Sequence, residues 1–512
     1  MRCGSLFVVL VVLAGCPGGD GSVGDHCGDP GDCASSLQCV ASTCVPKCQR
    51  ATDCGDGYSC DRDGICHAAA GQLGDACTSE VDCAAGLACE IEGSDASGHL
   101  LASCVAETPG SPAGSTCTGD ADCRNGTCAL GHCVDLCSDT RDCSEGTSCA
   151  LIPRVEAAGA MFAGCLQSHG VLRWPLPVHG PSDTVPLPIP DLARSVSVTF
   201  SVEDPNQMVG ATQIVSPDAQ VISMWDATHP DAYFMNPIVR HKPEFAQSVL
   251  AMPSTPDHLI DPANGRLASG MYTLRVESLR PGGGGGTATP NATAVIKLDA
   301  SVILDLHFYF LNFDEHPCAD AFNGKLDAST ASTASFFQQD YLGILRGVLA
   351  TQGGIALGTV TYEDLRNHPD LDALDVANAP ALLAFGAHTV GVNVFFVRTL
   401  SPVGLQAIGP APGPAGLAGT RGSGVVIGLD TLCYEPHGWQ DVARLTAHEI
   451  ARYMGLYDIV EADDPINHLD PISHDHDPDV SPSANLMFYS ELGGTSLTDG
   501  QRDILSRSPV LR

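Results

Sequence analysis

A histidine–glutamate pair near residue 450 has the side chains and the spacing of a metal-assisted hydrolytic site. His448 and Glu449 lie in a segment with apolar residues at helical spacing, and Arg452 follows one turn later. On a helix, residues four apart share a face, so histidines at 448 and 452 would bind one zinc ion while Glu449 acted as general base. Arginine cannot take that role, because its guanidinium stays protonated and offers no lone pair.

The residues that follow preserve other parts of this pattern. Gly455 stands seven positions after the histidine, where a glycine lets the chain leave the helix and return a third ligand. Asp458 occupies that third position and could supply an oxygen to a metal. We therefore take His448 and Asp458 as candidate metal ligands, Glu449 as the candidate catalytic base, and Arg452 as the degenerate ligand position.

Two hypotheses account for the arginine. In the first, Arg452 replaces the positive charge of the metal and pairs with Asp458 and Glu449. In the second, the next loop supplies a substitute zinc ligand. That loop also suits a solvated turn or a calcium-binding turn, and its donors are His468, Asp470, His474, Asp475, His476 and Asp477.

The elements that must position these residues form a mixed α/β segment, 301–512. The apolar run 303–311 predicts a dense strand, and segments 392–397 and 425–427 predict two more. Apolar residues at helical spacing predict a helix over 334–352, and the helix that carries His448 is expected to begin near Gln440. We expect Cys318 and Cys433 to form a disulfide, since no other cysteine lies in this segment.

Segment 169–300 has the pattern of a small antiparallel β-sandwich. Val196, Val198 and Phe200 alternate with polar neighbours, and the segment 272–276 repeats this period of two. No catalytic grouping occurs here. We interpret the segment as a spacer or an accessory binding domain.

Segment 17–168 is an internal repeat built on cysteine. Five quartets lie between Cys27 and Cys165, and the second cysteine of each quartet follows an aspartate. Zinc knuckles are a poor interpretation, because no quartet has a C-x2-C spacing. Units with so few large apolar residues need disulfides, of which four cysteines allow three pairings.

The first sixteen residues predict export. Arg2 precedes an apolar run that closes with Leu13-Ala14-Gly15-Cys16, which resembles a bacterial lipobox with Cys16 as the lipidated residue. The alternative is an ordinary cleaved signal peptide. Either places the protein outside the cytoplasm, as an outer-membrane or cell-surface lipoprotein held by its acyl chains, or as a secreted protein. A net charge of −35 argues against nucleic acid as a partner.

The C-terminal segment resembles the pappalysin-like branch of the metzincin metallopeptidases, on a bacterial Cys-rich lipoprotein. The resemblance rests on strand 304–310, the helix over 440–455, Asp470-Pro471-Ile472-Ser473, Asn485-Leu486-Met487-Phe488 and the tail 497–501. It implies a zinc cofactor, His448 as first ligand, Glu449 as base and Met487 as the Met-turn beneath the metal. The family's second and third histidines correspond to Arg452 and Asp458, so full zinc ligation does not carry over.

The sequence thus predicts a multidomain chain: disulfide-rich repeats, a small β-sandwich and an α/β (α+β) metzincin-like domain. The favoured function is a pseudoprotease that binds peptides or proteins at the cell surface. The alternative is an active zinc metalloendopeptidase with Glu449 as general base and a substitute ligand. A lost ligand favours the first, and the retained glutamate favours the second.

Overall fold

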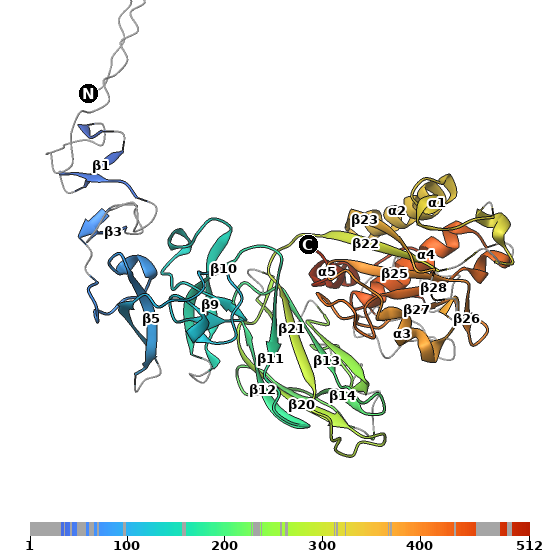
Figure 1. Ribbon diagram of the computed structural model, residues 1–512, viewed down its shortest axis with the longest axis horizontal. Coiled ribbons are helices and arrows are strands. Elements are labelled where there is room, and N and C mark those ends of the chain that lie inside the picture. Colours follow the sequence, from blue (N-terminus) through green and yellow to red (C-terminus); the bar gives the residue numbers. More distant parts are fainter. Residues whose placement is uncertain are drawn as a thin grey trace, which may run out of the picture.

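The structure is a computed structural model of the 512-residue chain. Its described elements follow one another from the Cys-rich hairpins, through a β-sandwich, to a mixed α/β part that holds the C-terminus (Figure 1). The described residues are 32–34, 36–40, 43–48, 58–60, 66–68, 71–95, 99–155, 160–226, 228, 236, 238–255, 259–261, 265–311, 313, 316–322, 324–366, 368, 371–434, 437–456, 482–488 and 494–512. The predicted signal segment with Cys16 lies outside the described residues, and so do Asp458 and the donor-rich loop 468–477.

The Cys-rich segment consists of small hairpins fastened by disulfides. In each fully described unit the first cysteine pairs with the third and the second with the fourth, which selects one of the three pairings that the sequence allowed. The bonds are Cys77–Cys89, Cys83–Cys104, Cys117–Cys128, Cys123–Cys133, Cys137–Cys149 and Cys143–Cys165, with Cys33–Cys44 in the first unit. The hairpin strands are β1 (Leu37–Val40), β2 (Thr43–Pro46), β3 (Tyr58–Cys60), β4 (Cys66–Ala68), β5 (Leu87–Ser94), β6 (Leu100–Ala106), β7 (Cys128–Ala129), β8 (His132–Cys133), β9 (Thr147–Pro153) and β10 (Met161–Gln167).

The recurring Asp-Cys pair has a structural cause. Asp82 Oδ2 accepts hydrogen bonds from the backbone N–H of Thr78 at 2.8 Å and of Ser79 at 3.0 Å. Asp122 and Asp142 bind their own loops in the same way. Each aspartate thereby closes the turn around a short 3₁₀ helix, η3 (Glu80–Asp82), η4 (Asp120–Asp122) or η5 (Thr140–Asp142).

Two antiparallel sheets pack face to face as a β-sandwich. One has the order β11-β21-β13-β17, and the other β12-β20-β14-β15, with β16 also on β14. Their facing side chains, such as Phe200 and Tyr272, are fully buried in one core. The strands are β11 (Val171–Leu176), β12 (Ser182–Ile189), β13 (Ser195–Ser201), β14 (Met208–Val215), β15 (Val221–Met224), β16 (Glu244–Phe245), β17 (Gln247–Met252), β20 (Gly270–Leu279) and β21 (Asn291–Lys297), beside the small pair β18 (Ile260–Asp261) and β19 (Arg266–Leu267).

The C-terminal part is built on a five-stranded mixed sheet. Its order is β23-β22-β25-β28-β27, and only the pairing of β27 with β28 is antiparallel. A further parallel pair joins β24 to β26. The strands are β22 (Ile303–Phe310), β23 (Ala356–Asp364), β24 (Ala373–Asp375), β25 (Val392–Val397), β26 (Thr399–Ser401), β27 (Ala407–Ile408) and β28 (Val425–Gly428).

Helices cover both faces of this sheet. Leu306 and Phe308 of β22 face a large core shared with α2, α4 and α5, whereas Tyr309 faces a smaller core shared with α3. The predicted helix 334–352 is divided, because a π-helical turn, η9, precedes α2. The helices are η8 (Ala319–Phe322), α1 (Ala328–Ala331), η9 (Phe336–Tyr341), α2 (Leu342–Gly353), η11 (Val376–Asn378), α3 (Ala379–Leu383), η12 (Leu429–Cys433), α4 (Trp439–Tyr453), η14 (Pro482–Ala484) and α5 (Asp499–Arg507).

The sandwich and the mixed sheet share a buried junction. Ser197 and Thr199, on the polar face of β13, are buried, although alternation alone predicts solvent on that side. Ser195 Oγ donates to the carbonyl of Arg507, and Arg173 Nη1 donates to the carbonyl of Gly416 at 2.8 Å. Among the described residues, no helix is long and apolar enough to cross a membrane.

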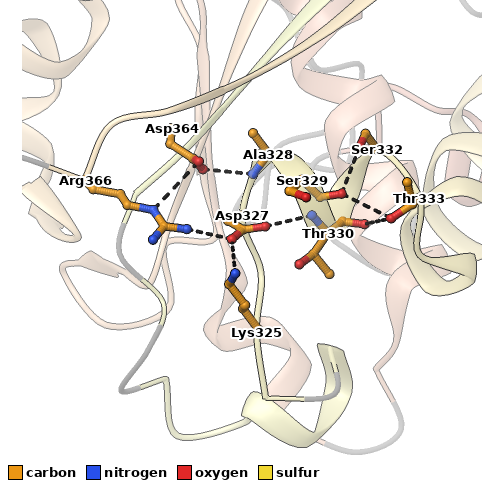
Figure 2. Close-up of polar contacts among 9 residues, drawn as sticks. All are labelled: Lys325, Asp327, Ala328, Ser329, Thr330, Ser332, Thr333, Asp364 and Arg366. Carbon is orange, nitrogen blue, oxygen red and sulfur yellow. Dashed lines mark hydrogen bonds and ion pairs between the residues drawn. The ribbon is translucent and has the colours of Figure 1, made fainter.

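A buried carboxylate fixes the start of α1. Asp327 is 3% exposed and accepts hydrogen bonds from Thr330 N at 2.7 Å and from Arg366 Nη2 at 2.6 Å, and Lys325 Nζ lies 2.6 Å away (Figure 2). Burial by itself would raise the pKa of this carboxyl. The hydrogen bonds from Lys325 and Thr330 outweigh burial and hold the pKa of Asp327 far below its usual range.

This arrangement predicts a pH-dependent contribution to stability. Asp327→Ala should lower the free energy of unfolding at pH 7 by about 1–2 kcal/mol, mainly through the lost cap, because the two cations are half-exposed. Asp327→Asn keeps a side chain that can cap the helix. The comparison of this variant with the wild type therefore isolates the contribution of the charge to stability. Since the folded pKa is depressed, the charge stabilises fully above about pH 4 and less as the pH falls below it. The free energies of unfolding of wild type and Asp327→Asn, measured in urea, should therefore converge as the pH falls below about pH 4. A difference between the two free energies that stays constant with pH would contradict this prediction.

Candidate functional site

The candidate site lies on α4, which packs one face against β28 and β27. The helix begins after Gly438, whose backbone N–H donates to Asp441 Oδ2 at 2.8 Å. Trp439 in the first turn donates its indole N–H to the carbonyl of Ala321 at 2.8 Å. The helix begins at Trp439, one residue before the predicted Gln440. The hydrogen bonds of Gly438 and Trp439 fix the direction in which it starts.

His448 is held by a turn from a distant part of the chain. Its side chain is buried, and Nδ1 lies 2.8 Å from the carbonyl oxygen of Leu486. Because that oxygen only accepts, Nδ1 carries a proton, which leaves Nε2 as the ring nitrogen that could ligate a metal. Metal-ligating histidines are commonly oriented by such a bond, so the ring has the tautomer that a ligand requires.

Helix α5 holds the turn that contains Leu486 in place. Met487 is fully buried, and its backbone N–H donates to Asn485 Oδ1 at 2.9 Å. Asn485 and Gln501 exchange side-chain hydrogen bonds at 2.9 and 3.3 Å, and Gln501 N donates to Thr498 Oγ1 at 3.2 Å. The tail 497–501 thus positions His448 through Asn485 and Leu486.

Glu449 pairs with Arg452 inside the helix. Arg452 Nη1 donates to Glu449 Oε1 at 3.4 Å, with the carboxylate side chain 4% exposed and the guanidinium side chain 29% exposed. The Oε2 atom of Glu449 accepts no hydrogen bond from any described residue. The carboxylate is therefore buried and directed partly at a cation.

The loop after β27 covers this carboxylate. A Cβ atom on Gly409 would lie 2.5 Å from Glu449 Oε2, so a larger residue there would have to displace the carboxylate. Farther along, Gly413 N donates to the carbonyl of Tyr453 at 2.8 Å, and Tyr453 OH donates to the carbonyl of Pro414 at 2.8 Å. The loop thus lies along the last two turns of α4.

The chain leaves α4 as the sequence predicts. Gly455 has a φ of 115°, which side chains with a Cβ rarely adopt. Beyond Leu456 the described chain is interrupted, and Asp458 lies outside it.

The described side chains do not suit a zinc ion. His448 supplies one suitable nitrogen, but the guanidinium of Arg452 occupies the next turn, where a second ligand would be needed. Arg452 also makes an interaction beyond its pair with Glu449. The described donor set is thus one imidazole beside a buried ion pair.

Four of the predicted site residues lie on the expected elements, and the structure adds two more to the site. His448, Glu449 and Arg452 share α4, and Met487 lies in the turn that contacts the histidine. Gly409 and Gln501 were not assigned roles. Gln501 follows Thr498 by three residues, a capping-box spacing that marks the start of α5 but not its contact with Asn485.

No family model matches the sequence, and a search of curated proteins finds no match.

Proposed function

We propose that the protein is an exported, disulfide-rich surface protein whose segment 301–512 is a metzincin-like domain that binds peptides or proteins without hydrolysing them. Three features support the proposal. They are the mixed sheet with one antiparallel edge strand, the helix with His448 and Glu449, and the turn with Met487 that contacts the histidine. The disulfides suit an oxidising compartment, and anchoring through Cys16 remains part of the proposal.

The ion pair between Glu449 and Arg452 is the observation on which the proposed absence of catalysis rests. A general base must present an accessible lone pair to the proton that it removes. Glu449 is 4% exposed, one oxygen faces the guanidinium, and the other lies under Gly409. Arg452 therefore gives the retained glutamate a structural reason to persist, since a buried carboxylate needs a compensating charge.

Peptide binding is proposed at the edge of the mixed sheet. The edge strand β27 pairs with β28 on one side, and no described strand pairs with its other side. An extended peptide can add to such an edge through backbone hydrogen bonds, with pockets selecting alternate side chains. Because the contacts are mostly main-chain, this site would accept many protein ligands.

An active zinc metalloendopeptidase is the second candidate, with a peptide bond of a protein as its substrate. The observation in its favour is His448, whose Nδ1–H bond to Leu486 gives the ring the tautomer of a metal ligand. This function requires further donors from outside the described residues, for which Asp458 and the loop 468–477 are the candidates. Arg452 would also have to leave Glu449.

A protease assay on the full oxidised chain separates the two functions. Incubation with a fluorescein-labelled unfolded protein in zinc-buffered medium should release no more peptide than the matched variant Glu449→Gln. Cleavage by the wild type that a chelator abolishes and that Glu449→Gln lacks would establish the peptidase instead. Retention of the labelled protein by immobilised chain should be equal for wild type and Glu449→Gln, because binding at β27 does not use the carboxylate.

A further inference from the structure

Two imidazole rings are stacked on the face of the mixed sheet that α3 covers. His307 lies on β22, and His388 lies in the loop that joins α3 to β25, residues 384–391, here called the α3–β25 loop. The ring centroids are 3.6 Å apart and the ring planes differ by 7°. His307 is 5% exposed, whereas the side chain of His388 is 33% exposed. The buried ring is therefore covered by a second ring that can also take up a proton.

The hydrogen bonds of His307 suit a neutral ring. Its Nε2 lies 2.9 Å from the carbonyl oxygen of Val390, which only accepts, so Nε2 carries a proton. Its Nδ1 lies 2.8 Å from Thr361 Oγ1, whose hydroxyl can donate to the lone pair of a neutral ring. Burial, and after it the neighbouring His388, lower the pKa of His307. The closed structure thus favours His307 without a charge.

Carboxylates near the two rings act against this effect but do not cancel it. Glu363 Oε1 lies 2.7 Å from His388 Nε2, a hydrogen bond that becomes charge-assisted when His388 is protonated. Asp305, also on β22, is held by Arg512 through two hydrogen bonds of 2.6 and 3.0 Å. The attraction of Asp305 and Glu363 for a charged His307 is weaker than the effects of burial and of His388. One positive charge is therefore accommodated beside Glu363, whereas a second on the stacked ring is repelled.

The same rings fasten the α3–β25 loop to the sheet. The carbonyl of Val390 belongs to this loop, and its side chain is 43% exposed. The backbone N–H of Ala387 donates to Tyr309 OH at 3.1 Å. Asn393 Nδ2 donates to the carbonyl of His388 at 3.2 Å. Side chains of β22 and β25 thus hold the loop mainly through polar contacts, one of which belongs to the buried imidazole.

We propose that the stacked pair is a pH-sensitive switch, which holds the α3–β25 loop closed while His307 is neutral and releases it when both rings are protonated. Release separates the two charges and lets water solvate them. In the open loop His307 titrates near the ordinary histidine pKa of about 6.5, and in the closed loop its pKa is lower. The closed form therefore has its full stability above about pH 6.5 and loses stability as the pH falls below that value. The switch does not depend on peptide binding at β27.

Release is expected to reach the loop between β27 and β28, which covers Glu449. In that loop Gly419 N donates to the carbonyl of Gly386 at 2.7 Å, and Gly386 belongs to the α3–β25 loop. Asn393 Nδ2, which binds His388, also donates to the carbonyl of Ser423 at 3.2 Å. Acid should therefore loosen both loops together.

Hydrogen exchange of the full oxidised chain, followed by mass spectrometry of its peptides, tests the switch. Protection is corrected for the intrinsic pH dependence of exchange and compared between about pH 7.5 and about pH 5.5. In the peptide that contains Ala387, protection should fall about three- to tenfold from about pH 6.5 to about pH 5.5, because uptake of one proton changes an opening equilibrium by at most about tenfold per pH unit. The peptide with Gly419 should follow, and peptides from β13 should stay protected.

Two variants and a matched control assign the effect to the stacked rings. In His307→Gln an amide replaces the buried titrating ring and can still bond with Val390 and Thr361, so protection should not change with pH. His388→Gln leaves His307 with burial alone against its charge, so the fall should move to lower pH. The control is His179→Gln, which removes an exposed histidine that also lies beside a carboxylate, and it should behave as the wild type.

Several results would overturn the switch. Constant protection in the wild type would do so, and so would an equal fall in His307→Gln. Loss of protection in all peptides, those of β13 included, would mean that acid unfolds the chain as a whole. If His307→Gln lacks protection even at about pH 7.5, His388→Gln decides the question. A lower midpoint in that variant supports the switch, and an unchanged midpoint rejects it.

Discussion

Arg452→Ala is expected to destabilise the C-terminal domain by roughly 2–3 kcal/mol. The substitution leaves Glu449, with a side chain 4% exposed, as a buried carboxylate without its cation. Breaking a buried pair in this way costs more than the pair itself contributes, because the remaining charge has lost its solvent. We expect a value at the low end of the cost of breaking a buried ion pair, because the Arg452 side chain is 29% exposed.

A double-mutant cycle isolates this pair from the other contacts of Arg452. Denaturant unfolding would be measured for Arg452→Ala, Glu449→Gln and the combination. Glu449→Gln removes the charge that needs compensation, so the combined variant should be more stable than Arg452→Ala alone. Additive effects would mean that the two side chains are energetically independent, and the ion pair would no longer account for the buried carboxylate of Glu449.

The site could be predicted from the sequence where it depends on local periodicity. Residues 448, 449 and 452 share a helix because apolar residues recur at helical spacing around them, and the i to i+3 contact of Glu449 with Arg452 follows from that helix. The burial of Glu449 could not be predicted, because it depends on Gly409, forty residues earlier in the chain and on a different element. Spacing fixes which side chains share a helix face but not which loop covers them.

In the fold as well, local features could be predicted from the sequence, whereas contacts between distant segments could not. Alternating apolar residues located β13 and β20, and the cysteine repeat indicated disulfides, because both signals lie within one element or one unit. The pairing of first with third cysteine depends on how each hairpin meets its 3₁₀ turn, which residue spacing does not encode. Likewise, Ser195 on the polar face of β13 is buried where its Oγ donates to the carbonyl of Arg507, a contact between residues 312 positions apart.

Arg452→His is expected to change the metal content of the protein from none to about one zinc per chain. The new imidazole would stand one turn after His448 on the same face of α4, and His448 already has its Nδ1 proton directed at Leu486. Two nitrogen ligands with aspartate or water in the remaining positions form an acceptable zinc site. The same substitution releases Glu449 from the guanidinium, so one residue would supply both a second nitrogen ligand and an unpaired base.

The matched control is Arg452→Gln, which also releases Glu449 but supplies no imidazole. Zinc per chain would be measured by mass spectrometry of the metal after dialysis of the oxidised full chains, in which the Cys318–Cys433 sulfurs are bonded and cannot contribute. Zinc in Arg452→His but not in Arg452→Gln or wild type means that the arginine is what prevents ligation. Zinc in the wild type would refute the pseudoprotease proposal and place the missing ligands in the segment after Leu456. Zinc in none of the three would mean that this part of α4 does not face a metal-binding cleft, and the metzincin-like interpretation of the domain would fail with it.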